Sequence, residues 1–261
     1  MVKKITLIAL FTSSLLFAKA SGEYSVNYVG MSMDYKEYKD GTLLDSESSG
    51  YSDLTGAEFK YKYNMEGETA SDSNAISLTI MALDGDTNYV GSYIGSSQGY
   101  GSLTGTTSNK IYDFDLDFAH IYQQSQHYKI IVSLGLGYRF WRRELSAQQV
   151  EDYKWYSLRP SLAFSYNYKS FSISPEFEYQ YGLRPRMKAS GVLAEEFKLG
   201  GANIMQFTLP VEYAFNQKFS LYGAYTYQYQ KIRESNVVSG FLEPESKAYN
   251  EYIKFGLIFK Y

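Results

Sequence analysis

Three aspartates at alternate positions and two histidines are the side chains of this sequence best suited to acid–base chemistry. Asp113, Asp115 and Asp117 are separated by single apolar residues, and His120 and His127 follow them. A carboxylate and a histidine that share a proton must lie within hydrogen-bond reach. In an extended strand, which rises roughly 3.3 Å per residue, Asp113 and His120 lie about 20 Å apart. The spacing therefore predicts no catalytic residue at this motif.

Long strands of alternating polarity must position these side chains. Residues 205–215 and 219–230 each place apolar and aromatic side chains on one face, with a three-residue turn between them. The same period of two indicates strands over 51–63, 75–84, 111–122, 129–143, 156–166 and 171–181, and more weakly from Glu23. We expect about ten strands, and the 85–110 region leaves eight or twelve compatible with the pattern. Pro175 and Pro210 predict a bulge or bend in their strands, because proline lacks a ladder donor.

The final strand has the clearest alternation. Residues 253–261 place apolar or aromatic side chains at every odd position, and Lys254, Gly256 and Lys260 lie between them. This ending resembles the closing strand of the outer-membrane β-barrel proteins of Gram-negative bacteria. The resemblance implies an all-β fold, a transmembrane antiparallel up-and-down β-barrel. It also implies that the barrel-assembly machinery reads this strand as an assembly signal through Phe255, Leu257, Phe259 and Tyr261.

The other end of the sequence predicts export. A basic start at Lys3 and Lys4 precedes a mostly apolar stretch and the cleavage pattern Ala18-Lys19-Ala20. We expect residues 1–20 to be a cleaved signal peptide and residues 21–261 to form the barrel. The absence of cysteine excludes a disulfide framework, and a net charge of -3 argues against a nucleic-acid partner.

If the oily face of each strand points to lipid, the opposite face lines the lumen. Acidic and basic strands then alternate around the wall and predict a lumen charge network. Its members are Asp113, Asp115, Asp117, Arg139, Arg143, Arg159, Glu176, Glu178, Glu212 and Lys254. Such charges either pair and fill the lumen or leave a thin polar channel or site. Gly135 and Gly137 either make room for large side chains or bend the wall.

The Asp113-x-Asp115 pair also resembles the omptin-type proteases, which are ten-stranded barrels. That resemblance implies carboxylates acting with a histidine at the outer rim. His127 falls in a predicted periplasmic turn and His120 lies just above it, so the correspondence fails at the histidine. No metal-ligand spacing and no phosphate-binding loop is present, so neither a metal nor a cofactor is expected. An enzyme of the outer leaflet that uses no histidine stays open as an alternative.

Basic residues at the external strand ends suggest a lipid partner. Arg142, Lys231 and Arg233 have lipid-facing parity and lie just above the expected apolar band, where the phosphates of lipopolysaccharide would meet them. Ordinary solvated charge is the alternative.

Short turns on one side of the barrel and longer polar connections on the other predict that both termini are periplasmic. The polar connections lie near 36–50, 88–110, 145–153, 188–202 and 235–248. The sequence thus favours a non-enzymatic outer-membrane barrel with an envelope-structural or surface-interaction role, ahead of a narrow porin and an outer-leaflet enzyme. It does not specify an oligomeric state.

Overall fold

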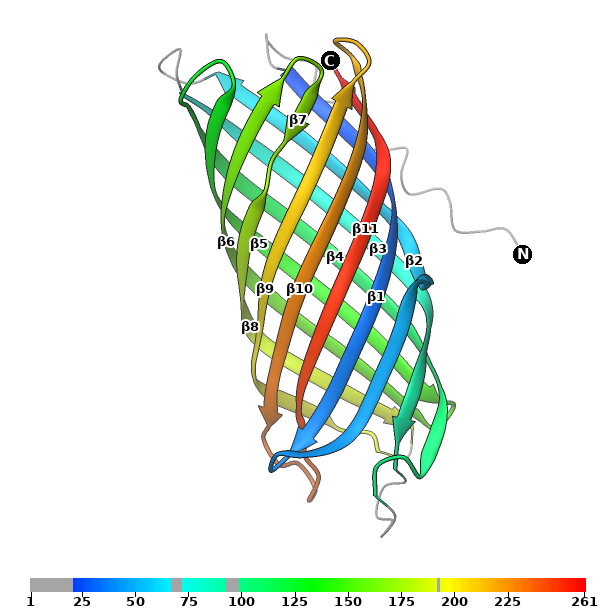
Figure 1. Cartoon of the computed structure of the whole chain (residues 1–261). Helices are drawn as coiled ribbons and strands as arrows, with labels where there is room; N and C mark the ends of the chain where they lie inside the picture. Colours follow the sequence, from blue (N-terminus) through cyan, green and yellow to red (C-terminus); the bar gives the residue numbers. More distant parts are fainter. Residues whose placement is uncertain (1–20, 67–71, 93–98, 192) are drawn as a thin grey trace, which may run out of the picture.

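The chain forms one closed sheet of antiparallel strands (Figure 1). The computed structural model describes residues 21–66, 72–92, 99–191 and 193–261, so the expected signal peptide at 1–20 lies outside the described residues. Within these ranges there are eleven strands. They are β1 Ser21–Lys39, β2 Thr42–Glu66, β3 Asp72–Gly91, β4 Leu103–Gln123, β5 Tyr128–Ser146, β6 Gln149–Tyr168, β7 Phe171–Ile173, β8 Glu176–Gly191, β9 Glu196–Ala214, β10 Phe219–Ser235 and β11 Glu245–Lys260.

Consecutive strands pair around the wall, and β1 pairs with β11 to close it. β7 and β8 follow each other along the same place in the wall, because both pair with β6 on one side and β9 on the other. The eleven strands therefore occupy ten positions. The expected up-and-down barrel of about ten strands is confirmed. No helix in the described ranges is long and apolar enough to cross a membrane.

The break between β7 and β8 lies at Ser174 and Pro175, where an interruption was predicted. The bulge or bend predicted in the strand of Pro210 itself is not found, because β9 runs through it in unbroken register with β10. The irregularity lies instead in the facing strand, where the pairing of β9 passes from β7 to β8. The carbonyl of Pro210 accepts a hydrogen bond from the amide of Ser174 (3.2 Å). In a strand, the N–H and C=O of one residue point to the same side, so the missing donor of Pro210 faces the break. The two prolines thus share one irregularity.

We call the end of the barrel that carries Ser21 and Tyr261 the near end, and the opposite end the far end. In the half next to the near end, apolar side chains point outward and polar ones point inward. Val26 on β1 and Leu162 on β6 are 62% and 56% exposed. Exposed apolar and aromatic residues continue around the wall on the other strands, as on β4 with Phe114, Leu116 and Phe118. This girdle is the apolar band that a lipid bilayer requires.

In the far half the polarity is reversed. The inward side chains pack into an apolar core that runs across the barrel, and outward positions such as Lys36 and Arg186 are polar or charged. The largest core members are Met33, Tyr35, Trp141, Tyr153, Trp155, Met187, Phe197 and Ile232. The expectation of long irregular connections at this end was therefore wrong for most of those residues. The strands continue through them, and the β1–β2 and β5–β6 connections are only two residues long.

The seam between the first and last strands is closed by aromatic rings. Tyr24 on β1 stacks on Tyr61 of β2 and on Tyr261, with centroids 4.9 and 5.5 Å apart. β1 and β11 keep one register over their whole paired length. The weak sequence pattern of β1 arises because its far half, from Val29 to Tyr35, turns its apolar side chains inward.

Candidate functional site

The half of the barrel next to the near end carries the apolar band and is called the near half or banded half. Arg159 is the centre of the ion pairs in the lumen of this half. β6 carries it inward, where its guanidinium contacts Asp115 on β4 and Glu178 on β8 (2.8 Å), with Asp117 at 3.8 Å. The side chain is 9% exposed, so water screens these charges only weakly. Three acids from two strands, β4 and β8, are in this way joined through one guanidinium on β6.

Two glycines on β5 leave the space that Arg159 and its partners occupy. A Cβ on Gly137 would lie 2.7 Å from Oδ1 of Asp115 and 2.9 Å from Cδ of Arg159. A Cβ on Gly135 would lie 2.0 Å from Oδ1 of Asp117. Both glycines keep unbroken register with β4 and β6. They therefore make room for the network and do not bend the wall.

Further pairs cross the lumen on both sides of Arg159, toward the far end and toward the near end. Arg139 donates to both carboxylate oxygens of Asp113 (2.7 and 2.6 Å) and to Gln230 across the barrel (3.0 Å). Lys254 contacts Glu58. Closer to the near end, Lys260 contacts Glu212, and Glu176 accepts from Ser161 (2.6 Å). A cavity of about 320 Å³ lies among these side chains. The structure thus places nine of the ten residues predicted for the lumen network around one space: Asp113, Asp115, Asp117, Arg139, Arg159, Glu176, Glu178, Glu212 and Lys254.

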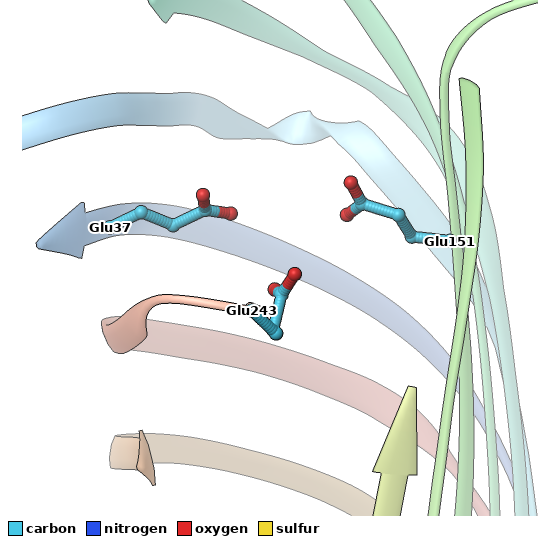
Figure 2. Close-up of side chains that lie close together, drawn as sticks. All are labelled: Glu37, Glu151 and Glu243. Atoms are coloured by element: carbon cyan, nitrogen blue, oxygen red, sulfur yellow. The ribbon is translucent and has the colours of Figure 1, made fainter. Parts of the chain in front are cut away.

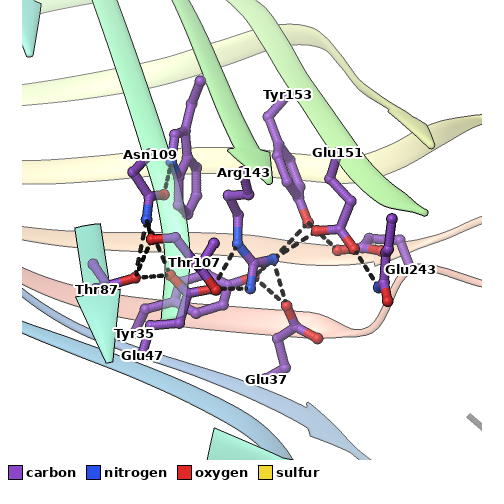
Figure 3. A network of polar contacts seen from close by, with 12 residues as sticks. Tyr35, Glu37, Glu47, Thr87, Thr107, Asn109, Arg143, Glu151, Tyr153 and Glu243 are labelled. Carbon is purple, nitrogen blue, oxygen red and sulfur yellow. Dashed lines mark hydrogen bonds and ion pairs between the residues drawn. The ribbon is translucent and has the colours of Figure 1, made fainter. Parts of the chain in front are cut away.

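The tenth predicted residue, Arg143, lies apart from this group in the far half. It is completely buried and meets three carboxylates (Figure 3). Its Nη1 donates to Glu37 (2.7 Å) and Glu151 (2.8 Å), and its Nε and Nη2 donate to Glu47 (3.1 and 2.7 Å). The guanidinium also lies 4.4 Å from the ring centroid of Tyr35. One cation from β5 therefore holds β1, β2 and β6 together.

A second layer of polar groups fixes the carboxylate of Glu47. Thr87 donates to it at 2.6 Å and Asn109 at 3.3 Å. The amide oxygen of Asn109 accepts from the indole of Trp141 (2.8 Å). Because hydrogen bonds to a buried carboxylate replace lost hydration, this acid is well accommodated in its charged form.

A fourth carboxylate, Glu243, enters from the connection between β10 and β11. The hydroxyl of Tyr153 donates to it, and its backbone amide donates to Ser235 Oγ (2.8 Å). Figure 2 shows its carboxylate turned toward those of Glu37 and Glu151. These three acids offer oxygens that all lie within 4.8 Å of one another, which is a spacing that a metal ion could use. Arg143 already bonds two of them, so the trio has a resident cation.

The buried acids at the far end outnumber the single buried cation, Arg143, and their pKa values are shifted. This group lies beyond the apolar band, since the outward neighbours of Arg143 and Glu151 are Arg142 and Asp152. Burial raises the pKa of Glu243 well above its usual range, and the charges of Glu151 and Glu37 add to the rise. Burial also raises the pKa of Glu151 despite the attraction of Arg143. Burial opposes ionisation of Glu47 too, but Arg143 and its hydrogen bonds lower its pKa.

Sequence reasoning missed Glu37, Glu47, Glu151 and Glu243. Each lies in a segment that was expected to be a connection, so none was assigned to an inner wall. For Glu37 and Glu151 the available signal was alternation with reversed polarity, and the serine-rich sequence around Glu47 carries no such signal. In Met31-x-Met33-x-Tyr35-x-Glu37, every second residue is buried and the intervening ones are polar or small. Nothing in the sequence marks Glu243, because it belongs to no strand.

The two histidines lie away from both groups of acids. His120 bonds Asn74 (2.8 Å) and packs against Tyr122 near the near end. His127 lies in the β4–β5 turn and bonds the carbonyl oxygen of Asn167 (3.0 Å). Asp113 is engaged by Arg139, seven residues along β4 from His120. The residues compared with an omptin-type site therefore do not come together.

The three basic residues suggested for lipopolysaccharide lie on the outer surface of the far half but are not equivalent. Nε and Nη2 of Arg142 donate to the two carboxylate oxygens of Asp152 (2.7 and 2.9 Å), and Lys231 pairs with Glu245 (3.0 Å). Arg233 is exposed on β10. The wall positions of β6, β8 and β9 separate Arg142 from the other two.

The closing strand presents its apolar side to the surroundings. Phe255 and Leu257 are 59% and 57% exposed, and Phe259 and Tyr261 are also exposed. The four residues suggested as an assembly signal thus lie on one outward face of β11 and on the residue that follows it.

Comparison with solved structures defines the class of fold. Outer membrane protease OmpT from Escherichia coli superposes with a TM-score of 0.59 at 11% sequence identity, covering 93% of this chain and 96% of that chain. An outer membrane channel from Pseudomonas putida F1 (TM-score 0.41, 11% identity, 93% and 97% covered) and Ail, the attachment invasion locus protein of Yersinia pestis (0.31, 10%, 94% and 100%), are more distant. The fold is that of an outer-membrane β-barrel protein.

The sequence gives no closer assignment. No protein-family model matches it, and no curated protein matches it either. At 11% identity the likeness to OmpT establishes the fold and not the activity.

Proposed function

We propose that this chain is an integral outer-membrane barrel of a Gram-negative envelope, sealed along its axis, with a structural or surface-interaction role and no catalytic one. The observation that carries the proposal is the double closure of the lumen. Paired charges around Arg139 and Arg159 cross and narrow the lumen of the near half, and the core around Trp141 and Tyr153 fills the far half. A barrel with ten wall positions has a narrow interior that side chains of this size can fill.

The orientation in the membrane is part of the same proposal. The apolar band supports a membrane-spanning near half, and an even number of wall positions returns both termini to one side. The turn after β9 is short, and β10 leads at the far end into the longer connection 236–244. Short periplasmic turns are typical of such barrels. We therefore place the near end and both termini in the periplasm, and the far end outside the cell.

Planar-bilayer recording tests the seal directly. The purified barrel, inserted in a lipid bilayer, is expected to give no stable single-channel steps. Heat-modifiable migration on a gel would show that the inserted protein is folded. Stable steps that disappear when Asp115 is enlarged in an Asp115→Tyr variant would overturn the seal, because that side chain lines the lumen.

The narrow channel is the second candidate, and one observation favours it. The cavity of about 320 Å³ in the banded half is lined by charged side chains, so ions could enter this part of the lumen. A conducting barrel would need the far-half core to move. Steps in the wild type would therefore place the gate at Trp141 and Tyr153.

Lipopolysaccharide is the lipid partner that this location suggests, and Arg142, Lys231 and Arg233 are the residues proposed to bind it. Arginine binds phosphate through two donors at once. Arg142 and Lys231 would have to exchange Asp152 and Glu245 for phosphate, and Arg233 is free of such a partner within the described chain. Replacing all three with alanine should reduce lipopolysaccharide co-purification. Unchanged co-purification and heat-modifiability would exclude these residues.

The barrel-assembly machinery is the partner proposed for biogenesis. The outward apolar face of β11, with Phe255, Leu257, Phe259 and Tyr261, supports this proposal. Its pairing with β1 closes the sheet into a barrel.

A further inference from the structure

The far mouth of the barrel contains more buried acid than buried base. Glu37, Glu47, Glu151 and Glu243 are each at most 7% exposed, and they surround a single guanidinium, that of Arg143. If all were ionised, four negative charges would face one positive charge. Like charges at such distances repel strongly where water is excluded, so a closed arrangement of this kind holds protons.

Three of these acids lie on strands, but Glu243 lies on residues 236–244, which connect β10 to β11. The start of this segment is bound to β9, where Asn236 and Lys198 exchange two hydrogen bonds (3.1 and 2.8 Å). Val238 packs against the far-half core, and Ser239 donates to Glu195 (2.6 Å) at the edge of the barrel. Glu243 is the member of the segment that reaches across the mouth, where it accepts from Tyr153 on β6. Its carboxyl group is therefore the contact that ties the end of the segment to the buried acids.

We propose that residues 236–244 are a proton-linked closure of the far mouth, in which Glu243 enters the acid cluster as a neutral carboxylic acid and the segment is released when that proton is lost. The proposal rests on the proposed function only in taking a sealed barrel as the resting state. Protonation replaces one of four competing negative charges with a hydrogen-bonding hydroxyl. The remaining acids accept hydrogen bonds from Arg143, Tyr35 and Tyr153.

Every titratable group around Glu243 and its neighbouring acids contributes to the balance of charge at the far mouth. β1 supplies Tyr35 and Glu37, β2 supplies Asp45 and Glu47, β3 supplies Tyr89, β5 supplies Arg143, and β6 supplies Glu151 and Tyr153. β8 and β9 contribute apolar side chains such as Met187 and Phe197. Burial and the charge of Glu37 raise the pKa of Asp45 to about 7, so a second proton is held nearby around neutral pH. Arg143 is the one cation in this set.

The sign of the pH effect follows from the raised pKa of Glu243. In the released segment this carboxyl would ionise near its ordinary value of about 4.3. Between that value and its raised value, the closed form binds one more proton than the open form. The ratio of closed to open molecules therefore falls by up to about tenfold for each unit of pH. Glu47, whose pKa is lowered, contributes the opposite slope only at pH values below its ordinary range.

Amide hydrogen exchange of the barrel in lipid vesicles tests the proposal between pH 5 and pH 8. The readout is the protection factor of residues 235–243, the exchange rate of an unstructured amide divided by the measured rate, which removes the intrinsic effect of pH. The amides of Ser235 and Glu243 are bonded within the segment and report its opening. We expect protection in the wild type to fall by up to about tenfold per pH unit. Protection in the turn at 215–219 of the near end should stay constant.

Two variants separate a proton at Glu243 from a general loosening of the barrel. Glu243→Gln keeps a neutral side chain, so its protection should not depend on pH. Glu234→Gln removes an exposed acid of β10 nine residues earlier and should behave as the wild type. Should Glu243→Gln not fold, Glu151→Gln removes a charge that raises the pKa of Glu243, so protection should stop falling at a lower pH than in the wild type. A pH-independent wild type, or a Glu243→Gln variant with the wild-type slope, overturns the closure. Conductance at neutral pH would instead overturn the seal and leave the exchange result standing.

Discussion

At the scale of single residues, Arg142 and Arg143 are adjacent in sequence and face opposite environments. Arg143 is completely buried among carboxylates, and Arg142 is exposed beside Asp152. Replacing Arg143 with methionine leaves the acids without their cation. Removing one partner of a buried ion pair typically costs about 3–5 kcal/mol. We expect a loss of that size in the free energy of unfolding, measured by urea titration in lipid vesicles with tryptophan fluorescence as the signal.

The loss should be smaller at pH 5 than at pH 8, because acids without a cation bind protons more readily. Arg142→Met is the matched control. Its ion pair is exposed and should contribute about 1 kcal/mol or less. Equal losses in the two variants would show that the buried cluster is not held together by Arg143.

The inward residues of the near half could be predicted singly, since lipid forces one face of each strand to be apolar. Asp115 and Arg159 are examples, and both line the cavity. Their exact partners could not be predicted, because partners come from strands whose register the sequence does not show. Glu243 could not be placed at all, because it belongs to no strand, and Glu37 could be placed only by reversing the rule that oily faces point outward, which fails in the far half.

At the scale of elements, β5 is built to leave space. Gly135→Ala would place a Cβ 2.0 Å from Asp117 and press it toward Arg159. We expect a loss of about 1–3 kcal/mol, the usual cost of overpacking. The same urea titration measures it. Gly223→Ala on β10 is the control, because its Cβ would meet nothing closer than Phe255 at 3.8 Å. Greater tolerance at Gly135 than at Gly223 would contradict a space-making role.

The existence of most strands could be predicted from their alternation, and their lengths could not. β1 and β2 continue to a two-residue connection at Asp40 and Gly41, both with positive φ. The sequence between residues 42 and 50 is rich in serine and acid, which is typical of loops. It forms a strand because its inward side chains, Glu47 above all, are bound by partners from distant strands. Tertiary contacts outweigh local preference here.

At the scale of the whole molecule, the two halves of the barrel wall have opposite polarity. The near half is oily outside and polar inside, and the far half is polar outside and oily inside. The same sheet serves both halves, because side chains alternate while the backbone pairing continues unchanged. We expect the level at which the polarity reverses to lie at the surface of the membrane. It also explains why the overall composition resembles that of a soluble protein.

This reversal predicts how the cost of a charge depends on height. Leu134 on β5 lies within the apolar band and is 52% exposed, and Thr106 on β4 is equally outward but lies in the far half. A lysine facing the middle of the bilayer costs about 2–4 kcal/mol, and this falls to roughly 0–1 kcal/mol near the interface. Leu134→Lys should therefore lower the free energy of unfolding in vesicles by about that larger amount, and Thr106→Lys should leave it nearly unchanged. Repeating the titration in thinner and thicker bilayers would change the first value and not the second. A large cost at Thr106 would mean that lipid covers the far half as well, and that the reversal of polarity does not mark the membrane surface.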